Sequence, residues 1–198
     1  TVLDLDTLSV LSTVTDPKLR TPEGLAVTAD GKTLFVAMSG QDAVAVLSTD
    51  THQVMKEIPT GGKTPMRLLL SPDGRTLYVA NDQSYSVAVI DTSAGTVVAT
   101  VNVGKQPRGL ALTPDGKTLL VVNVSEDTLS FVDTATRAVT GPIGLGHAPQ
   151  RIVFAPDGQL AFVTSRASAD VLLVDMRGNR RRTNKKSLLV GNQPNGLA

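Results

Sequence analysis

The chain has 198 residues, of which 41% are hydrophobic, and its 19 basic and 18 acidic side chains leave a formal net charge of +1. This length and composition predict one domain with a substantial core, and the balanced charge excludes a general attraction to nucleic acid or an anionic membrane. The absence of cysteine excludes disulfides, thiolate metal sites and a cysteine nucleophile.

The first 21 residues begin without Met and without the pattern of a signal peptide, which indicates a mature or trimmed chain. Two short apolar segments in VLDLDTLSVLSTV predict a pair of strands that belongs to an incomplete repeat unit. Here and further along the sequence, no apolar run reaches the roughly 18 residues that a membrane span requires.

A repeat of about 42 residues begins at residue 22. In each unit a proline precedes an apolar run, an Asp-Gly pair and a second apolar run, as in TPEGLAVTADGKTLFVAMS, TPMRLLLSPDGRTLYVAND, QPRGLALTPDGKTLLVVNV and APQRIVFAPDGQLAFVTSR. These prolines and the one in a final QPNGLA are spaced 43, 42, 42 and 45 residues apart.

Each unit contains four short segments rich in Val, Leu, Ile and Thr, separated by turn residues, and none keeps a helical periodicity. In the second unit we predict strands at 67–70, 76–81, 86–91 and 96–103. The first two are joined by a turn in which Gly74 adopts the left-handed conformation. Because the first strand is almost continuously apolar, we expect it to be central and covered on both faces.

Four-stranded units that repeat at this period predict an all-β protein with the β-propeller fold, built from four-stranded antiparallel blades whose first strands line the axis. We treat residues 1–198 as one propeller domain. It comprises a partial blade (1–21), four full blades (22–64, 65–106, 107–148 and 149–193) and the start of a further blade (194–198).

The segments GLALTPDGKTLLVVN, RTLYVANDQSYSVAVIDTSAGTVVATVNVG and LSFVDTATRAVTGPIGLG resemble the YVTN-type β-propeller repeat. The resemblance covers essentially the whole chain and implies a periplasmic, extracellular or cell-surface protein. Relatives include surface-layer propellers, lactone hydrolases and proteins associated with quinoprotein pathways. The fold alone does not fix an activity, because propellers carry unrelated functions.

Propellers of this type commonly have seven blades, which at this period need about 294 residues. We therefore expect a fragment or an interrupted copy of a larger ring. The alternative is closure at five blades, with PNGLA pairing with the N-terminal strands. In either case, exposed strand edges would allow pairing with another chain.

The string GLALTPDGKT at residues 109–118 resembles a phosphate-binding loop at first sight. Such a loop needs four residues between its glycines and a helix directly after it, whereas here six residues separate the glycines and a strand follows. We interpret the string as a strand and a hairpin turn.

One repeat position breaks the pattern. Two residues after the proline, three units have Gly24, Gly109 and Gly196, but the other two have Arg67 and Arg151. Because the architecture accepts glycine there, the arginines are candidates for a functional role.

Further candidates are expected on the same face of the propeller. Glu23, Arg108 and His147 lie where the loops between blades enter the first strands, and Arg166 lies in a loop between a second and a third strand. Guanidinium groups converging on the channel would bind an anionic ligand, because their planar fork matches a carboxylate or a phosphate. The alternative is that each arginine pairs with an acidic neighbour such as Asp82 and joins adjacent blades.

No cofactor is predicted, although scattered carboxylates on this face allow calcium. His52 is expected on the opposite face from His147, so we expect neither a shared metal site nor a Ser-His-Asp triad.

The segment MRGNRRRTNKK contains six basic residues and no acidic one, and we predict it as a loop between two strands. It is either a solvated loop or a contact with an anionic surface, through Arg180, Arg181, Arg182, Lys185 and Lys186. We expect no specific nucleic-acid binding, because aromatic residues make up only 3% of the chain.

These features together favour a non-catalytic binding or interaction propeller that presents its arginine-bearing face to a small anionic ligand or a protein partner. The alternative is a propeller enzyme, such as a lactone hydrolase or a quinoprotein-associated redox protein.

Overall fold

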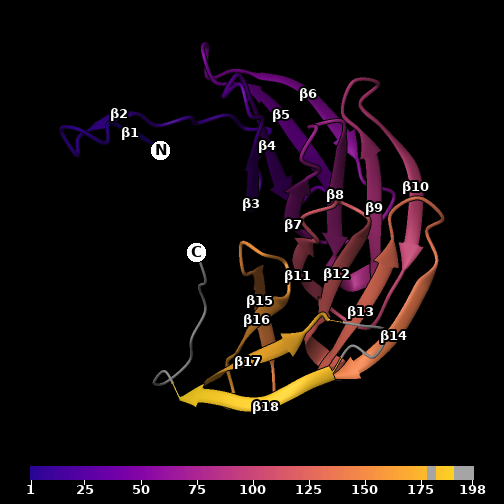
Figure 1. The fold of residues 1–198 in the computed structure, drawn as a ribbon. Coiled ribbons are helices and arrows are strands. Elements are labelled where there is room, and N and C mark those ends of the chain that lie inside the picture. The colour runs from indigo at the N-terminus through magenta and orange to yellow at the C-terminus, as the bar shows by residue number, and fades with distance from the viewer. Residues whose placement is uncertain (178–181, 190–198) are drawn as a thin grey trace.

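Four antiparallel sheets stand side by side in an arc, with their first strands on the inner side and their fourth strands on the outer side (Figure 1). The computed structural model describes residues 1–177 and the backbone of strand 182–189. Each repeat forms one sheet because its β-branched segments are separated by turns that reverse the chain. The predicted all-β fold of four-stranded antiparallel blades is confirmed.

We number the blades along the chain. Blade 1 comprises β3 (Pro22–Val27), β4 (Thr33–Met38), β5 (Ala43–Ser48) and β6 (Val54–Pro59). Blade 2 comprises β7 (Pro65–Leu70), β8 (Thr76–Asn81), β9 (Ser86–Asp91) and β10 (Thr96–Asn102). Blade 3 comprises β11 (Pro107–Leu112), β12 (Thr118–Asn123), β13 (Thr128–Asp133) and β14 (Val139–Gly144). Blade 4 comprises β15 (Pro149–Phe154), β16 (Leu160–Ser165), β17 (Asp170–Asp175) and β18 (Arg182–Leu189).

Two smaller features complete the described chain. The N-terminal strands β1 (Val2–Leu3) and β2 (Val10–Ser12) pair with each other and project from blade 1 (Figure 1). Short 3-10 helices η1 (Asp82–Ser84) and η2 (Val124–Glu126) join the second and third strands of blades 2 and 3.

The segment GLALTPDGKT contains the end of β11, the hairpin turn that follows it and the first residue of β12. Asp115 accepts hydrogen bonds from the Thr113 hydroxyl (2.6 Å) and the Lys117 amide (3.0 Å). These bonds, the hydroxyl first, hold the pKa of Asp115 below its ordinary value. Gly116 has φ +68°, which a residue with a side chain rarely adopts. The turn therefore satisfies its own polar groups, and its glycine is needed by the backbone.

The core lies between successive blades. One cluster joins Phe35 and Val44 of blade 1 to Leu68, Leu77 and Ile90 of blade 2, and equivalent clusters join the later blades. The first strand is covered on both faces, as expected, because Leu68 and Leu70 of β7 pack toward blade 1 and Leu69 packs toward blade 3. It is nevertheless less buried than β8 and β9. The inner strand borders the axis, while the middle strands have a strand on each edge and a blade on each face.

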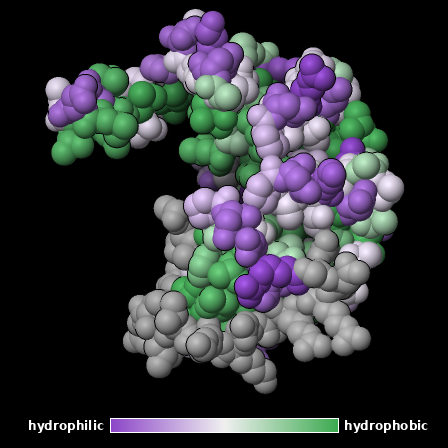
Figure 2. All heavy atoms as spheres, viewed as in Figure 1, coloured by the Kyte–Doolittle hydropathy of each residue, from purple (hydrophilic) through white to green (hydrophobic). Residues whose placement is uncertain are grey.

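The inner strand of blade 1 shows which side chains the contact between neighbouring blades buries. Leu25 of β3 is 63% exposed, whereas residues at the same position of the repeat, Leu68 and Ile152, are 9% and 5% exposed. No blade of the described chain packs against β3 on that side. Figure 2 shows hydrophobic residues on the projecting N-terminal hairpin as well, where Leu5 and Leu8 are exposed.

Two leucine truncations at this one repeat position test the packing. We expect Leu68→Ala to lower the free energy of unfolding by about 2–4 kcal/mol, because it opens a cavity between two blades. Leu25→Ala should cost less than about 1 kcal/mol, because its side chain is already largely in water. Urea denaturation of both variants measures the difference, and equal losses would show that the blades do not bury this position.

Candidate functional site

Loops from neighbouring blades meet at one end of the arc, which we call the channel face. It is formed by the loops between second and third strands and by the loops between blades. The residue before each blade proline has φ between +52° and +57°, at Thr21, Thr64, Gln106 and Ala148. Each carbonyl there accepts the amide of the residue after the second strand, at 2.9 to 3.1 Å. The predicted meeting of these loops at one end is therefore observed.

Glycine and arginine alternate along the inner strands. A Cβ added to Gly24 would lie 2.7 Å from the Met66 carbonyl oxygen, and one added to Gly109 would lie 2.9 Å from the Gln150 carbonyl oxygen. Neither position can hold a side chain unless the neighbouring inner strand moves. At the other two described positions of this kind, Arg67 and Arg151 carry long side chains.

Arg67 lies close to other cationic groups. Burial lowers its pKa from the ordinary value, and the positive charges of Arg151 and Arg108 lower it further, while Glu23 acts in the opposite direction. Its Nη1 donates to the Met66 carbonyl at 3.1 Å, and its Nε is buried with no hydrogen-bond partner among the described residues. The charges that act on Arg67 thus come from two further guanidinium groups and one carboxylate, and this excess of positive charge around Arg67 favours an anion.

Arg108 also joins two blades. Its Nε donates to the buried carboxylate of Asp82 at 2.7 Å, so a residue of β11 is tied to the loop of blade 2. The alternative interpretation, in which an arginine pairs with an acidic neighbour, thus holds for this residue. Arg151 occupies β15, where its amide donates to the Thr164 hydroxyl at 3.2 Å. Arg166 lies after β16 on the same face, and its amide donates to the Ala148 carbonyl.

His147 forms a pair with Asp127. Its Nδ1 lies 2.9 Å from Asp127 Oδ2, while Asp127 Oδ1 accepts the Ala148 amide at 2.8 Å. Asp42 makes the equivalent contacts between blades 1 and 2, with Lys63 Nζ and the Thr64 amide, both at 2.8 Å. These pairs were not predicted from the sequence, although each joins an aspartate to a basic residue of the next loop. The imidazole is largely exposed on the channel face.

The predicted basic loop is only partly described. Arg180 and Arg181 lie outside the described residues. Arg182, Lys185 and Lys186 belong to β18, so the prediction of a loop is wrong for them. β18 pairs with β17 from Asp175 opposite Arg182 to Asp170 opposite Leu189, because blade 4 needs this segment as its fourth strand.

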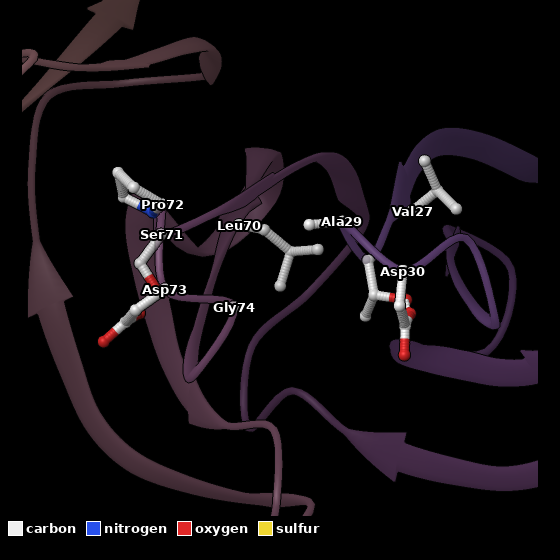
Figure 3. Close-up of a pocket in the computed structure, with 9 residues that line it drawn as sticks. Val27, Ala29, Asp30, Leu70, Ser71, Pro72, Asp73 and Gly74 are labelled. Atoms are coloured by element: carbon white, nitrogen blue, oxygen red, sulfur yellow. Dashed lines mark hydrogen bonds between the residues drawn. The ribbon is translucent and has the colours of Figure 1, made fainter.

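A groove of about 410 Å³ lies at the other end of blades 1 and 2 (Figure 3). Val27, Ala29, Leu70 and Pro72 line it together with polar turn residues. Asp73, at its rim, accepts the hydroxyl of Ser71 and the amide of Arg75. Because this carboxylate already serves the hairpin turn, we place the candidate site on the channel face.

In the described part of the chain, no three His, Asp or Glu side chains gather in a way that would hold a metal ion. Nor is any helix there long and apolar enough to cross a membrane.

The model of the lactonase family, described as a seven-bladed β-propeller, matches residues 3–102. The chain belongs to this lactonase propeller family. The model of the YNCE-like β-propeller matches residues 93–181. No curated protein matches the chain in sequence.

Solved structures share the fold of this lactonase-family chain. The periplasmic gluconolactonase of Pseudomonas aeruginosa is 22% identical with a TM-score of 0.77, over 99% of this chain and 64% of that one. A putative 6-phosphogluconolactonase from Bacteroides uniformis is 17% identical with a TM-score of 0.72, over 87% and 58%. Hydrazine synthase of Kuenenia stuttgartiensis is 25% identical with a TM-score of 0.75, over 89% and 53%. The chain thus spans between 53% and 64% of the length of these proteins.

The family match corrects our main expectation about function. A non-catalytic binding propeller is contradicted, because the lactonase family and its structural neighbours favour the alternative, a propeller enzyme of the lactone hydrolase kind.

Removal of one partner tests the inter-blade ion pair. Arg108→Ala leaves the buried Asp82 carboxylate without its cation, and we expect a loss of about 1–3 kcal/mol in the free energy of unfolding. The double variant Arg108→Ala, Asp82→Asn should recover part of that loss, because the unpaired charge is gone. Urea denaturation measures both, and a single variant as stable as the parent would contradict the contact.

The Asp42 contacts predict a dependence of stability on pH. The Lys63 hydrogen bond, followed by the Thr64 amide, lowers the pKa of Asp42 below its ordinary 3.8. The folded pKa is thus below the unfolded one, so the stabilisation is present above about pH 3.8 and is lost as the pH falls through the folded pKa. We expect Asp42→Asn to lower Tm at pH 6, and we expect the difference in Tm from the parent to shrink as the pH falls below 3.8. Lys63→Gln, which keeps the amide contact, should have a smaller effect, and identical pH profiles for parent and Asp42→Asn would refute this account.

Proposed function

We propose that the protein is a lactone hydrolase whose channel face binds a lactone that carries an anionic group. The observation that carries the proposal is the membership of the lactonase family together with Arg67, Arg108 and Arg151 on one face. A partly buried arginine whose Nε has no described partner is suited to a carboxylate or phosphate oxygen. The names of the neighbours, gluconolactonase and putative 6-phosphogluconolactonase, support a sugar lactone.

Hydrolysis needs a base for water and a group that stabilises the oxyanion. In the tautomer that carries the proton on Nδ1, His147 donates a hydrogen bond to Asp127. Its Nε2 then has a lone pair that can accept a proton from a water molecule. The water oxygen would attack the lactone carbonyl carbon while its proton passes to Nε2. Collapse of the tetrahedral intermediate would break the ring C–O bond, and the ring oxygen would take that proton. The arginines would stabilise the negative charge on the way to the hydroxy acid.

We extend the proposal to repeat type and location. The blades carry YVTN-type repeats, supported by the quoted segments. A periplasmic location is supported by the similarity to a periplasmic gluconolactonase.

The arginine pair can be tested with residues that the repeat itself uses. The double variant Arg67→Gly, Arg151→Gly places glycine two residues after the proline in every blade. We expect its kcat/KM for a phosphorylated sugar lactone to fall by about a hundredfold. The control is Arg75→Gln, which replaces a turn residue of blade 2 with the glutamine that blade 4 has at the same position, Gln159. This variant should keep full activity. Absence of hydrolysis above the uncatalysed rate by the unmodified chain would refute the function. Unchanged kcat/KM in the double variant would refute the site.

His147 is tested separately. We expect His147→Gln to lower kcat by about a hundredfold or more with little change in KM, because it removes proton transfer and not binding. Asp127→Asn should lower kcat less and shift its pH profile. A His147→Gln variant with the kcat of the parent would assign the base elsewhere.

A further inference from the structure

Buried polar atoms recur at one position of the repeat. The last residue of the second strand faces the first residue of the third strand across the pair, as Asn81 with Ser86, Asn123 with Thr128, and Ser165 with Asp170. These pairs contain most of the buried side-chain atoms that have no hydrogen-bond partner among the described residues: both amide atoms of Asn81, Ser86 Oγ, Asn123 Oδ1, Ser165 Oγ and Asp170 Oδ1. A buried polar atom without a partner is costly, so this position calls for a bound species.

In blade 4 a loop glycine lies against this position. A Cβ added to Gly146 would lie 2.9 Å from Ser165 Oγ and 2.9 Å from Ser168 Oγ. Ser168 Oγ accepts the amide of His147 at 3.2 Å, which leaves it a further lone pair. Ser165 Oγ, Ser168 Oγ and Asp170 Oδ1 form what we call the blade 4 oxygen cluster.

The cluster differs in chemistry from its counterparts. Blades 2 and 3 place an asparagine amide and a hydroxyl at the strand pair, and an amide NH₂ group suits water better than a cation. Blade 4 replaces the amide by Ser165 and the hydroxyl by Asp170, so that every side-chain ligand is an oxygen and one is a carboxylate. Ser165 is 0% and Asp170 8% exposed. A charge buried to this degree requires a counter-charge.

We propose that the blade 4 oxygen cluster binds a hard divalent cation of the calcium class. Hard cations take carboxylate, hydroxyl and carbonyl oxygens as ligands. The sequence allowed calcium through scattered carboxylates, whereas the structure assigns it to one carboxylate with two hydroxyls. This site is separate from the arginine pair and does not depend on lactone hydrolysis.

Calcium titration of the chelator-treated full chain tests the proposal. By calorimetry we expect one equivalent of calcium to bind. The double variant Ser165→Asn, Asp170→Ser reproduces the pair of blade 2, and it should lose more than about tenfold in affinity. Glu126→Gln removes an exposed carboxylate on the same face and should bind as the parent does. Failure of the parent to bind calcium, or an equal loss in Glu126→Gln, would overturn the assignment.

Stability distinguishes a cation from a water molecule or a simple hydrogen bond. Calcium should raise the Tm of the parent and leave that of Ser165→Asn, Asp170→Ser unchanged. In chelator the order should reverse, because the double variant no longer buries a carboxylate whose Oδ1 has no hydrogen-bond partner among the described residues. A double variant with the lower Tm in both buffers would overturn the proposal in favour of a water-filled or protonated site.

Transfer of the site gives an independent readout. Blade 2 already has Ser84 at the position of Ser168, so Asn81→Ser with Ser86→Asp completes the same set there. We expect this variant to bind two equivalents of calcium. A folded variant that still binds one equivalent would show that these three side chains do not define the site.

Discussion

The close approach of neighbouring inner strands is the constraint on which the rest of the structure depends. At Gly24 and Gly109 the carbonyl of the next strand occupies the space that a side chain would need. Long side chains are therefore restricted to alternate blades, where Arg67 and Arg151 lie on either side of Gly109. Burial, followed by the charge of Arg151, lowers the pKa of Arg67. The same packing that closes the blades together thus concentrates positive charge at the channel face.

Face-to-face contact of successive blades supplies most of the core. The middle strands have neighbours on both edges and both faces, and Leu77, Val79 and Ile90 are fully buried as a result. Leu25 lacks such a neighbour and is exposed. The contacts across the channel face, from Asp82 to Arg108 and from Asp127 to His147, then fix each loop against the next blade. A rigid scaffold with polar groups on its loops is the usual arrangement of an enzyme site.

Much of this architecture was accessible from the sequence because the repeat carries its own turn signals. The strands of blade 2 were predicted almost to the residue, since Asp73 and Gly74 mark the first hairpin and β-branched runs mark the strands. The alternation of Gly109 with Arg67 and Arg151 also identified the candidate site. The His147–Asp127 pair was missed because its partners are 20 residues apart and meet only when two loops converge. The burial of Asp170 was equally inaccessible, because a repeat pattern does not show which polar residue lacks a partner.

The central claim is that Arg67 and Arg151 form an anion site, and the most direct measurement is nuclear magnetic resonance of the arginine Nε–H groups during titration with inorganic phosphate. The account predicts a saturable shift of the Arg67 and Arg151 signals at one equivalent, with Arg75 on the opposite face unaffected. Shifts that are absent, or that are equal for Arg67 and Arg75, would contradict it.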